Sequence, residues 1–307
     1  MAKHTIILDC DPGVDDALAL MLALASPEAI EIAGITTVAG NVSLDDVTRN
    51  ARGLLALAGR SDIPLHAGCA RPLMRAVGHR AVVHGEHGLG GVLLPHDAVD
   101  VAPGHAVDFI IDTVMANPGR ITLCPIGPMT NVALAMVKEP RLAENLREIV
   151  FMGGSAFGPG NTTASAEFNF YVDPHAAQIM LSSGARMTMF GLDVTSKVAA
   201  DPALLAQLES IPGARAKALV RMMTAYAKGD PCLHDPCVIA WLIDPSLFSG
   251  IDALVDVECV PGSNYGRSVA HVTEKHRCGK APNCLVIDGA ETARIFDLFD
   301  ARLRLLD

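Results

Sequence analysis

The stretch TIILDCDPGVDDALALMLALAS, residues 5–26, decides the fold because it joins an apolar strand to an apolar helix through a strongly acidic turn. Its apolar, partly β-branched start predicts a strand at Thr5–Leu8, and the periodic run after the turn predicts a helix at Asp15–Ser26. Four aspartates fall within eight residues here, at Asp9, Asp11, Asp15 and Asp16. Like charges this close repel each other unless a cation or a shared proton compensates, so the turn predicts an ion site in preference to ordinary helix capping.

Outward from this stretch, short apolar strands alternate with helix-length segments as far as residue 200. Further strands are predicted at Ile30–Val38, Ile121–Ile126, Ile149–Met152 and Met187–Leu192. Further helices are predicted at Leu44–Leu57, Ala106–Ala116, Met129–Val137 and Pro174–Ser183. This βα alternation indicates an α/β fold, with an open, mostly parallel (mixed) sheet and helices on both faces.

The pattern changes after residue 200, where three helical stretches come before the next strand. Helices are predicted at Pro202–Ser210, Ala214–Lys228, Pro236–Leu242 and Thr292–Leu305, and strands at Ala253–Cys259, Ser268–Val272 and Leu285–Ile287. The segment Gly262–Pro282, rich in Gly, Lys, Arg and His, is expected to be a long mobile loop. Without a linker or an internal repeat, residues 1–307 are expected to form one domain whose later part covers one end of the sheet.

Composition narrows the possible partners. The chain has 24 Lys and Arg against 34 Asp and Glu, a formal net charge of −10, which argues against nucleic acid as a ligand. The longest early apolar run, Ala17–Ala25, is too short to cross a bilayer, and no secretory signal pattern is visible, so we expect a cytoplasmic protein without a membrane partner. The eight cysteines form no CxxC pair, which predicts reduced core residues and neither disulfides nor a zinc site.

The acidic turn lies where ligands of open parallel sheets bind, beyond the carboxyl end of a strand. Asp11 and Asp16 bracket the turn at Pro12-Gly13 and could converge on one ion, and hard carboxylate ligands suit Ca²⁺ or Mg²⁺. A DxD pattern after a first strand is also similar to phosphatases of the haloacid-dehalogenase type, in which the first Asp is the nucleophile. A phosphatase is therefore an alternative function.

Two later segments add polar groups of the right chemistry. In CLHDPCVIAWLIDP, residues 232–245, His234 can donate a proton near neutral pH, and the adjacent Asp235 can complete the shell of a cation. The loop MGGSAFGPGNTTASAEFN, residues 152–169, lacks the GK[ST] and GxGxxG patterns of phosphate cradles. Its Asn161, Glu167 and Asn169 instead offer hydrogen-bonding groups suited to sugar hydroxyls.

Six motifs in order, DCDPGVDD, ITTVAGN, HGEHGLG, CPIGPMTN, MGG…AEFN and LHDPC, resemble the nucleoside hydrolase family of the inosine-uridine-preferring N-ribohydrolase type. The resemblance covers residues 4–245 and is weaker beyond them. It implies calcium-dependent hydrolysis of the N-glycosidic bond of a ribonucleoside to ribose and free base, by a homodimer or homotetramer. A nucleoside- or pentose-binding protein without turnover is a second alternative, but Asp11 and His234 would then have no proton to transfer.

The resemblance assigns the metal and the proton transfers to a small set. The carboxylates of Asp11, Asp16 and Asp235, with the backbone carbonyl of Ile126, would bind Ca²⁺. Many relatives have Thr at the position of Ile126, a change to which a carbonyl ligand is indifferent. Asp11 would act as general base on the attacking water, and His234 would protonate the departing base.

The resemblance also assigns the substrate contacts. Asp15 would hold the ribose 2′-hydroxyl and Asn169 the neighbouring hydroxyls. Asn161 and Glu167 would hold the 5′-hydroxyl, and Asn41 would help to orient the water. Met152 would line the other face of the sugar, and His84 would approach the base. Tyr226, on the helix before His234, is a further candidate for the base. The segment PCLHDPCVIAWL resembles pyrimidine-preferring relatives and favours pyrimidine nucleosides as substrates. The segment AYAKGDPC departs from the inosine-uridine pattern, so the sequence does not decide between purine and pyrimidine bases.

Overall fold

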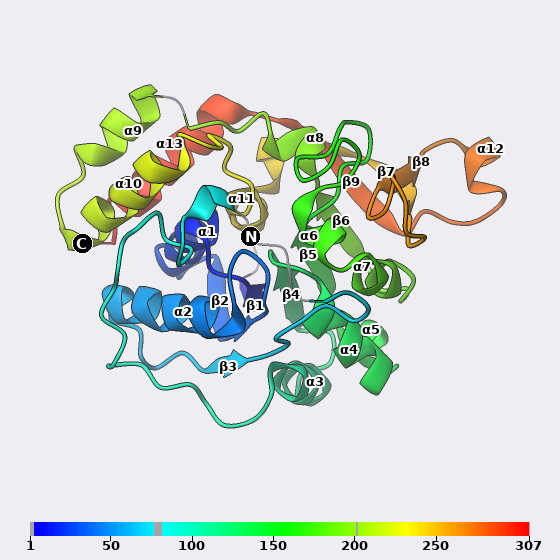
Figure 1. The fold of residues 1–307 in the computed structure, drawn as a ribbon, viewed down its shortest axis with the longest axis horizontal. Coiled ribbons are helices and arrows are strands. Elements are labelled where there is room, and N and C mark those ends of the chain that lie inside the picture. The colour runs from blue at the N-terminus through cyan, green and yellow to red at the C-terminus, as the bar shows by residue number, and fades with distance from the viewer. Residues whose placement is uncertain (1–2, 77–81, 201, 307) are drawn as a thin grey trace.

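A computed structural model describes residues 3–76, 82–200 and 202–306. Its centre is a nine-stranded sheet in the order β3-β2-β1-β4-β5-β6-β9-β7-β8 (Figure 1). The strands are β1 (His4–Cys10), β2 (Ile30–Thr37), β3 (Leu65–Ala67), β4 (Ile121–Pro125), β5 (Glu148–Met152), β6 (Met187–Phe190), β7 (Phe248–Val257), β8 (Ser268–His271) and β9 (Cys284–Ala290). The neighbouring strands β3, β2, β1, β4, β5, β6 and β9 pair in parallel. Strand β7 pairs antiparallel with both β9 and β8. The predicted α/β class with a mostly parallel, mixed sheet is confirmed.

The helices connect these strands and close the C-terminal part. They are α1 (Val14–Leu24), α2 (Leu44–Ala58), α3 (Ala106–Ala116), α4 (Thr130–Lys138), α5 (Leu142–Asn145), α6 (Phe168–Val172), α7 (Pro174–Leu181), α8 (Leu192–Thr195), α9 (Pro202–Glu209), α10 (Ala214–Tyr226), α11 (Pro236–Ile243), α12 (Glu274–Arg277) and α13 (Thr292–Leu303), with 3₁₀ turns η1 (Val82–His84) and η2 (Pro245–Leu247). Within the described ranges, no helix combines the length and the apolarity that crossing a bilayer requires.

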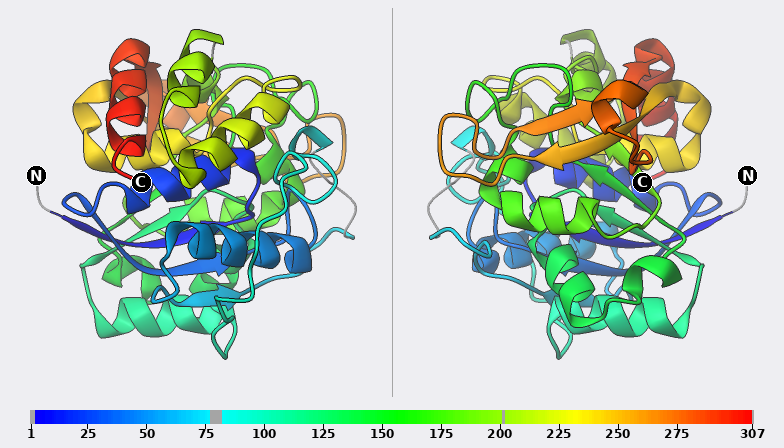
Figure 2. Two further views of the ribbon diagram at one scale, coloured as in Figure 1. Left: turned by 90° about the vertical axis from the view of Figure 1, so that its left-hand side faces the viewer. Right: turned by 90° about the vertical axis from the view of Figure 1, so that its right-hand side faces the viewer.

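The central strand sends alternate side chains into two separate cores. Ile6 and Leu8 of β1 pack into one cluster with α1, α10, α11 and α13, while Ile7 packs into the other with α3, α4 and α7. Figure 2 shows the same arrangement, with the red α13 and the yellow-green α10 on one side of the sheet and the teal α3 on the other. Because helices cover both faces, the inner strands are buried throughout, as their apolar sequences predict.

Several local predictions are corrected. The segment Gly262–Pro282, expected as a long loop, contains α12 in addition to the expected strand β8, and both project from one edge of the molecule (Figure 1). Strand β7 starts at Phe248, before the predicted Ala253, because its first half pairs with β9. All eight cysteines are free thiols, as expected, but Cys278 is exposed and is not a core residue.

Asp173 joins three parts of the chain at the start of α7. Its carboxylate accepts hydrogen bonds from the backbone N–H of Leu73 at 2.8 Å, the hydroxyl of Thr130 at 2.7 Å and the N–H of Ala176 at 3.1 Å. The side chain is 1% exposed, so its loss would leave these donors without a partner in a buried place. Asp173 therefore acts both as a helix cap and as a tie between the loop after β3, α4 and α7.

We expect Asp173→Ala to lower the free energy of unfolding by about 2–4 kcal/mol, because a cap and two further charge-assisted hydrogen bonds disappear together. Asp244→Ala is the matched control, since Asp244 also precedes a proline but lies nearer the surface, where it caps η2 through Ser246 and pairs with Arg294. Its cost should be about 0.5–1 kcal/mol. Urea unfolding of both variants measures the difference, and equal losses would contradict the tying role of Asp173.

Candidate active site

A cavity of about 350 Å³ opens beyond the carboxyl ends of β1, β2, β4 and β5, where the N-terminus of α11 meets them. Ligand pockets of this kind and size are usual at this edge of open α/β sheets. Most of the residues predicted from the sequence line it, namely Asp11, Asp15, Asn41, His84, Ile126, Met152, Asn161, Glu167, Asn169, Tyr226, His234 and Asp235. Asp16 lies immediately beneath them, 1% exposed. Its lining also includes Val82, Val83, Thr162, Phe168, Gly229 and Asp230, which the sequence analysis did not single out.

Asp11 is held in place by the backbone around it. Its Oδ2 accepts a hydrogen bond from the N–H of Asn41 at 2.6 Å, and the Asn41 side chain donates to the Asp11 carbonyl at 3.1 Å. Two glycines make room for the carboxylate: a Cβ on Gly127 would lie 2.5 Å from Oδ1, and one on Gly40 would overlap Oδ2. Glycine is therefore required at both positions by close approach to Asp11.

The carboxylate of Asp16 accepts hydrogen bonds from backbone N–H groups of its own turn. Its Oδ2 accepts the N–H of Gly13 at 2.8 Å, and its Oδ1 accepts the N–H of Asp11 at 3.2 Å. Both aspartates of the first turn, Asp15 and Asp16, lie at the positive end of α1, which favours negative charge there. The turn is thus pre-organised by backbone donors before any ion binds.

Asp235 differs from the other aspartates that precede a proline. Asp173 and Asp244 use their carboxylates to cap the following helix, whereas Asp235, as described in the structure, makes no side-chain capping bond to α11. One oxygen each of Asp15, Asp16 and Asp235 lies within 4.8 Å of the others. Opposite ligands of Ca²⁺ lie about 4.8 Å apart, so these three could share one ion of that size.

The structure groups Asp15, and not Asp11, with Asp16 and Asp235 at this spacing, which differs from the ligand set implied by the resemblance. Asp11 is nevertheless close to this group: its charge raises the pKa of Asp235, and the charge of Asp16 raises the pKa of Asp11. All four carboxylates therefore belong to a single electrostatic unit.

Burial dominates the titration of this unit. It raises the pKa of Asp11 and of Asp235 well above the usual value, and the pKa of Asp16 to about 7, with repulsion from the neighbouring carboxylates adding to the effect. The carboxyl groups of Asp16 and Asp235 are close enough to share a proton. A hard divalent cation would replace that proton, so the all-oxygen donor set fits such an ion.

Asp9, the remaining aspartate of the stretch at residues 5–26, does not line the cavity. It is fully buried, and its Oδ1 accepts hydrogen bonds from the hydroxyl of Thr36 at 2.6 Å and from the side chain of Asn131 at 2.8 Å. Among the described residues, its Oδ2 has no hydrogen-bond partner. Burial raises the pKa of Asp9 to about 6, although the two hydrogen bonds act in the opposite direction. Asp9 therefore ties β1 to β2 and α4.

The predicted sugar contacts gather along one wall. Asn169 donates from its amide to the carbonyl of Ile126 at 2.8 Å and to that of Met152 at 3.2 Å. Glu167 caps α6, with Oε1 accepting the N–H of Asn169 at 2.8 Å and Oε2 the N–H of Gly154 at 2.7 Å. The oxygen of Asn161 accepts the N–H of Phe168 at 3.0 Å. Each polar group is thus fixed by the backbone.

His84 and Tyr226 form the opposite wall. Their rings stack with centroids 4.9 Å apart. Nδ1 of His84 accepts the N–H of Val14 at 3.1 Å, which leaves the proton of a neutral imidazole on Nε2. Burial lowers the pKa of His84, with the charge of His234 acting in the same direction. His84 is therefore a neutral hydrogen-bond donor.

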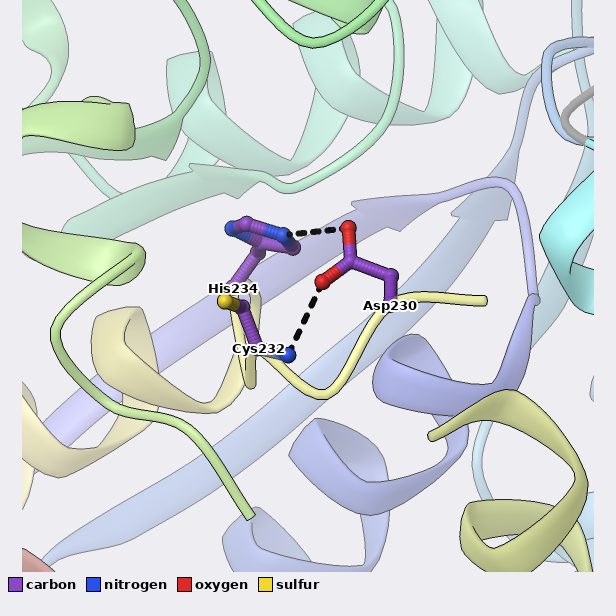
Figure 3. A group of neighbouring side chains, drawn as sticks. All are labelled: Asp230, Cys232 and His234. Carbon is purple, nitrogen blue, oxygen red and sulfur yellow. Dashed lines mark hydrogen bonds and ion pairs between the residues drawn. The ribbon is translucent and has the colours of Figure 1, made fainter. Parts of the chain in front are cut away.

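His234 is paired with two residues that the sequence analysis did not assign. Nδ1 lies 2.8 Å from the hydroxyl of Thr195, which itself donates to the carbonyl of Gly191, so Nδ1 is the donor to Thr195. Nε2 lies 3.3 Å from Oδ2 of Asp230 (Figure 3). Burial alone would lower the pKa of His234, but the hydrogen bond to Asp230 and the surrounding carboxylates outweigh it, so that the pKa is raised. His234 is thus stabilised as a cation.

The sequence analysis did not single out Asp230, although its place four residues before His234 was a signal for the pair. Thr195 lies 39 residues earlier and gave no signal.

Comparison with known proteins agrees with this geometry. Residues 6–297 match the model of the family described as inosine-uridine preferring nucleoside hydrolase. The chain is 41% identical to the inosine-uridine preferring nucleoside hydrolase of Crithidia fasciculata, covering 86% of this chain and 87% of that one. It is 39% identical to the pyrimidine-specific ribonucleoside hydrolase RihA of Shewanella baltica, covering 100% and 98%. The structure of a purine-preferring ribonucleoside hydrolase from Gardnerella vaginalis superposes with a TM-score of 0.92 at 32% identity, covering 98% of each chain.

The raised pKa of Asp9 predicts how the stability of the protein, freed of divalent ions, depends on pH. Asp9 binds its proton more tightly in the folded state (pKa about 6) than in the unfolded state (about 3.9), so its stabilising contribution is complete below about pH 4 and is lost as the pH rises through about 6. Asp9→Asn removes this titration. Relative to the wild type, the variant should gain on the order of 2–3 kcal/mol between about pH 4 and pH 8. Urea unfolding at both pH values measures it, and parallel pH profiles would refute the assignment.

Proposed function

Because this chain belongs to the inosine-uridine preferring nucleoside hydrolase family and is a nucleoside hydrolase, we propose that it cleaves the N-glycosidic bond of ribonucleosides with the help of Ca²⁺, yielding ribose and free base. One observation carries the proposal. Buried carboxylates line a cavity that is also lined by a stacked histidine–tyrosine pair and by His234, a histidine with a raised pKa. The carboxylates suit a cation and the hydroxyls of a pentose, and the aromatic and imidazole groups suit a base.

The lining of the cavity argues against the phosphatase alternative. Of the described residues that line it, none is Lys or Arg, while Asp11, Asp15, Glu167, Asp230 and Asp235 are all acidic. A phosphate monoester would bring a second concentration of negative charge to this site without a cationic side chain to receive it. A neutral nucleoside meets no such penalty.

The calcium ligands in the proposal are the carboxylates of Asp11, Asp16 and Asp235 and the carbonyl of Ile126. The oxygen-only donor set and the raised pKa values of these acids support a hard cation at this position. When bound, the ion supplies a positive charge that neutralises the carboxylates, holds ribose hydroxyls and lowers the pKa of a bound water.

Asp11 is proposed as the general base for the attacking water. It is 1% exposed and lines the cavity, and it is fixed by the N–H of Asn41 at 2.6 Å. Asn41, next to it, would help to orient the water.

The ribose is proposed to lie between Asp15 and the Asn169 wall. Asp15 would accept the 2′-hydroxyl, Asn169 would bind the neighbouring hydroxyls, and Met152 would pack on the sugar. Positive charge develops on the sugar as the glycosidic bond breaks, and the surrounding carboxylates stabilise it electrostatically. Asn161 and Glu167 would hold the 5′-hydroxyl; Glu167 keeps carboxylate lone pairs free beyond its backbone contacts.

The leaving base would lie between the His84–Tyr226 wall and His234. His234 is the acid in this proposal because Asp230 and Thr195 together hold it in the doubly protonated form. His84, which is neutral, would contribute a hydrogen bond and no proton. We propose a preference for pyrimidine bases, supported by the full-length similarity to the RihA sequence.

Incubation with uridine, cytidine, inosine, adenosine and guanosine tests the whole proposal. With Ca²⁺ present, ribose should be released fastest from uridine and cytidine, and a calcium chelator should abolish release until Ca²⁺ is restored. A reducing-sugar assay measures ribose. No ribose from any of the five with Ca²⁺ present would remove the hydrolase function, and faster release from inosine, adenosine or guanosine would remove only the base preference.

Asp11→Asn should fold like the wild type and lose about 10²–10⁴ in turnover, because the amide cannot accept the proton of the attacking water. Asp45→Asn, which makes the same charge change at an exposed site on α2, is the matched control and should retain full activity. Steady-state kinetics with uridine, alongside circular dichroism, separates activity from folding. Near-normal turnover in Asp11→Asn would show that another group is the base.

A further inference from the structure

We propose that Asp230, Cys232 and His234 form a second metal site, selective for a thiophilic divalent ion such as Zn²⁺, and that its occupation inhibits the enzyme. The inhibition, though not the binding, rests on the proposed role of His234 as the acid. The absence of a CxxC pair in the sequence predicted no zinc site, and the arrangement of these three residues revises that expectation.

The three side chains converge because they alternate along an extended segment. Residues two apart on an extended chain point to the same side, which applies here to Asp230, Cys232 and His234. Backbone pairing fixes the segment: Ala200 donates to the carbonyl of Pro231, and Leu233 donates to that of Val198. One donor atom of each of the three side chains lies within 4.8 Å of the others, and Figure 3 shows them on one short loop.

The spacing of the two harder donors suits a tetrahedral ion. Two ligands bound at about 2.0–2.1 Å with a tetrahedral angle between them lie about 3.3 Å apart. Nε2 of His234 and Oδ2 of Asp230 are 3.3 Å apart. An ion could therefore take the place of the shared hydrogen with little movement of either side chain, and the Cys232 thiol would turn to become the third ligand.

A fourth position would remain open on the cavity side. Asp230 and His234 line the cavity, whereas Cys232 does not, and its thiol contacts the carbonyl of Ser196. Three protein ligands with one open position are typical of zinc sites that bind water or a substrate group. The site is thus reachable from solvent by the same entrance as the nucleoside.

Ligand chemistry separates this site from the proposed calcium site. The carboxylates around Asp11 offer oxygen alone, which suits Ca²⁺, whereas sulfur, nitrogen and oxygen together favour Zn²⁺ or Co²⁺. Burial and the charge of Asp230 raise the pKa of the Cys232 thiol to about 12, so Cys232 is a neutral thiol without the ion. Binding of the ion releases two protons to solvent, the thiol proton of Cys232 and the Nε2 proton that His234 shares with Asp230.

Occupation of the site would disable the acid. Once the lone pair of Nε2 is bonded to an ion, His234 has no Nε2 proton to give to the departing base. The ion would also add positive charge close to the place where the sugar becomes positive, which opposes catalysis.

Co²⁺ serves as the spectroscopic probe of binding. The calcium-loaded wild-type enzyme titrated with Co²⁺ should develop the near-ultraviolet charge-transfer band of a thiolate–cobalt bond. Cys232→Ser should lose this band, and Cys278→Ser, which removes an exposed thiol elsewhere, should keep it. A wild-type enzyme without the band, or a band that survives in Cys232→Ser, would overturn the site. Cys232→Ala, which also lacks the thiol, provides the same test if Cys232→Ser fails to fold.

Zn²⁺ then tests the inhibition in the same samples, in excess Ca²⁺. Cys232 does not line the cavity, so Cys232→Ser should keep its basal uridine hydrolysis. The Zn²⁺ concentration for half-inhibition should rise about tenfold or more in Cys232→Ser and remain unchanged in Cys278→Ser. Equal inhibition of all three proteins, or relief by further Ca²⁺, would place the Zn²⁺ effect at the calcium carboxylates and overturn the proposal. Loss of all hydrolysis before Zn²⁺ is added would instead contradict the proposed function, while the cobalt band would still report the site.

Discussion

The mutual repulsion of four buried carboxylates is the constraint on which the rest of the site depends. Asp11, Asp15 and Asp16 come from the turn after β1, and Asp235 comes from the start of α11, more than two hundred residues later. Backbone N–H groups partly stabilise the carboxylates of Asp11 and Asp16, whereas the carboxylate of Asp235 makes no capping hydrogen bond to α11. An ion bound among these carboxylates would relieve the repulsion and link the turn after β1 to the start of α11. Binding of the ion would therefore also stabilise the fold.

The sheet brings these groups together because neighbouring parallel strands end at the same edge. β1 lies between β2 and β4, and the turns that follow these three strands carry Asp11, Asn41 and Ile126 respectively. Glycines at positions 40 and 127 allow the second and third turns to approach the carboxylate of the first. The close approach that Asp11 requires therefore explains the glycines at these two positions.

Much of this arrangement follows from the sequence, because it rests on strong periodicity and on local turn chemistry. The helix Leu44–Ala58, predicted at Leu44–Leu57, is bounded by Ser43 and by Gly59 in the left-handed conformation. The missed elements lack such signals. The strand at Leu65–Ala67 has three residues, and Phe168–Val172, an aromatic and β-branched segment typical of a strand, is helical because the buried carboxylate of Glu167 caps it.

Within the site, the sequence identified the residue types better than their partners. The pairing of His234 with Asp230 depends on the path of a short loop, and its pairing with Thr195 depends on the packing of α8, and neither has a periodic signature. The same limit applies to the carboxylates, where charge density in the sequence indicated an ion site but not that Asp15, Asp16 and Asp235 each place an oxygen within 4.8 Å of the others.

The two histidines of the cavity show how one pocket separates hydrogen bonding from proton transfer. Both are buried, and burial alone lowers the pKa of each. His84 receives a hydrogen bond from the backbone of Val14 on Nδ1, so one nitrogen must stay unprotonated and the ring stays neutral. His234 has an acceptor at each nitrogen, Thr195 and Asp230, so the ring is most stable when both carry protons. Two histidines of one cavity therefore differ in chemistry: His84 is held as a neutral hydrogen-bond donor, whereas His234 is held so that it can carry a second proton and release it.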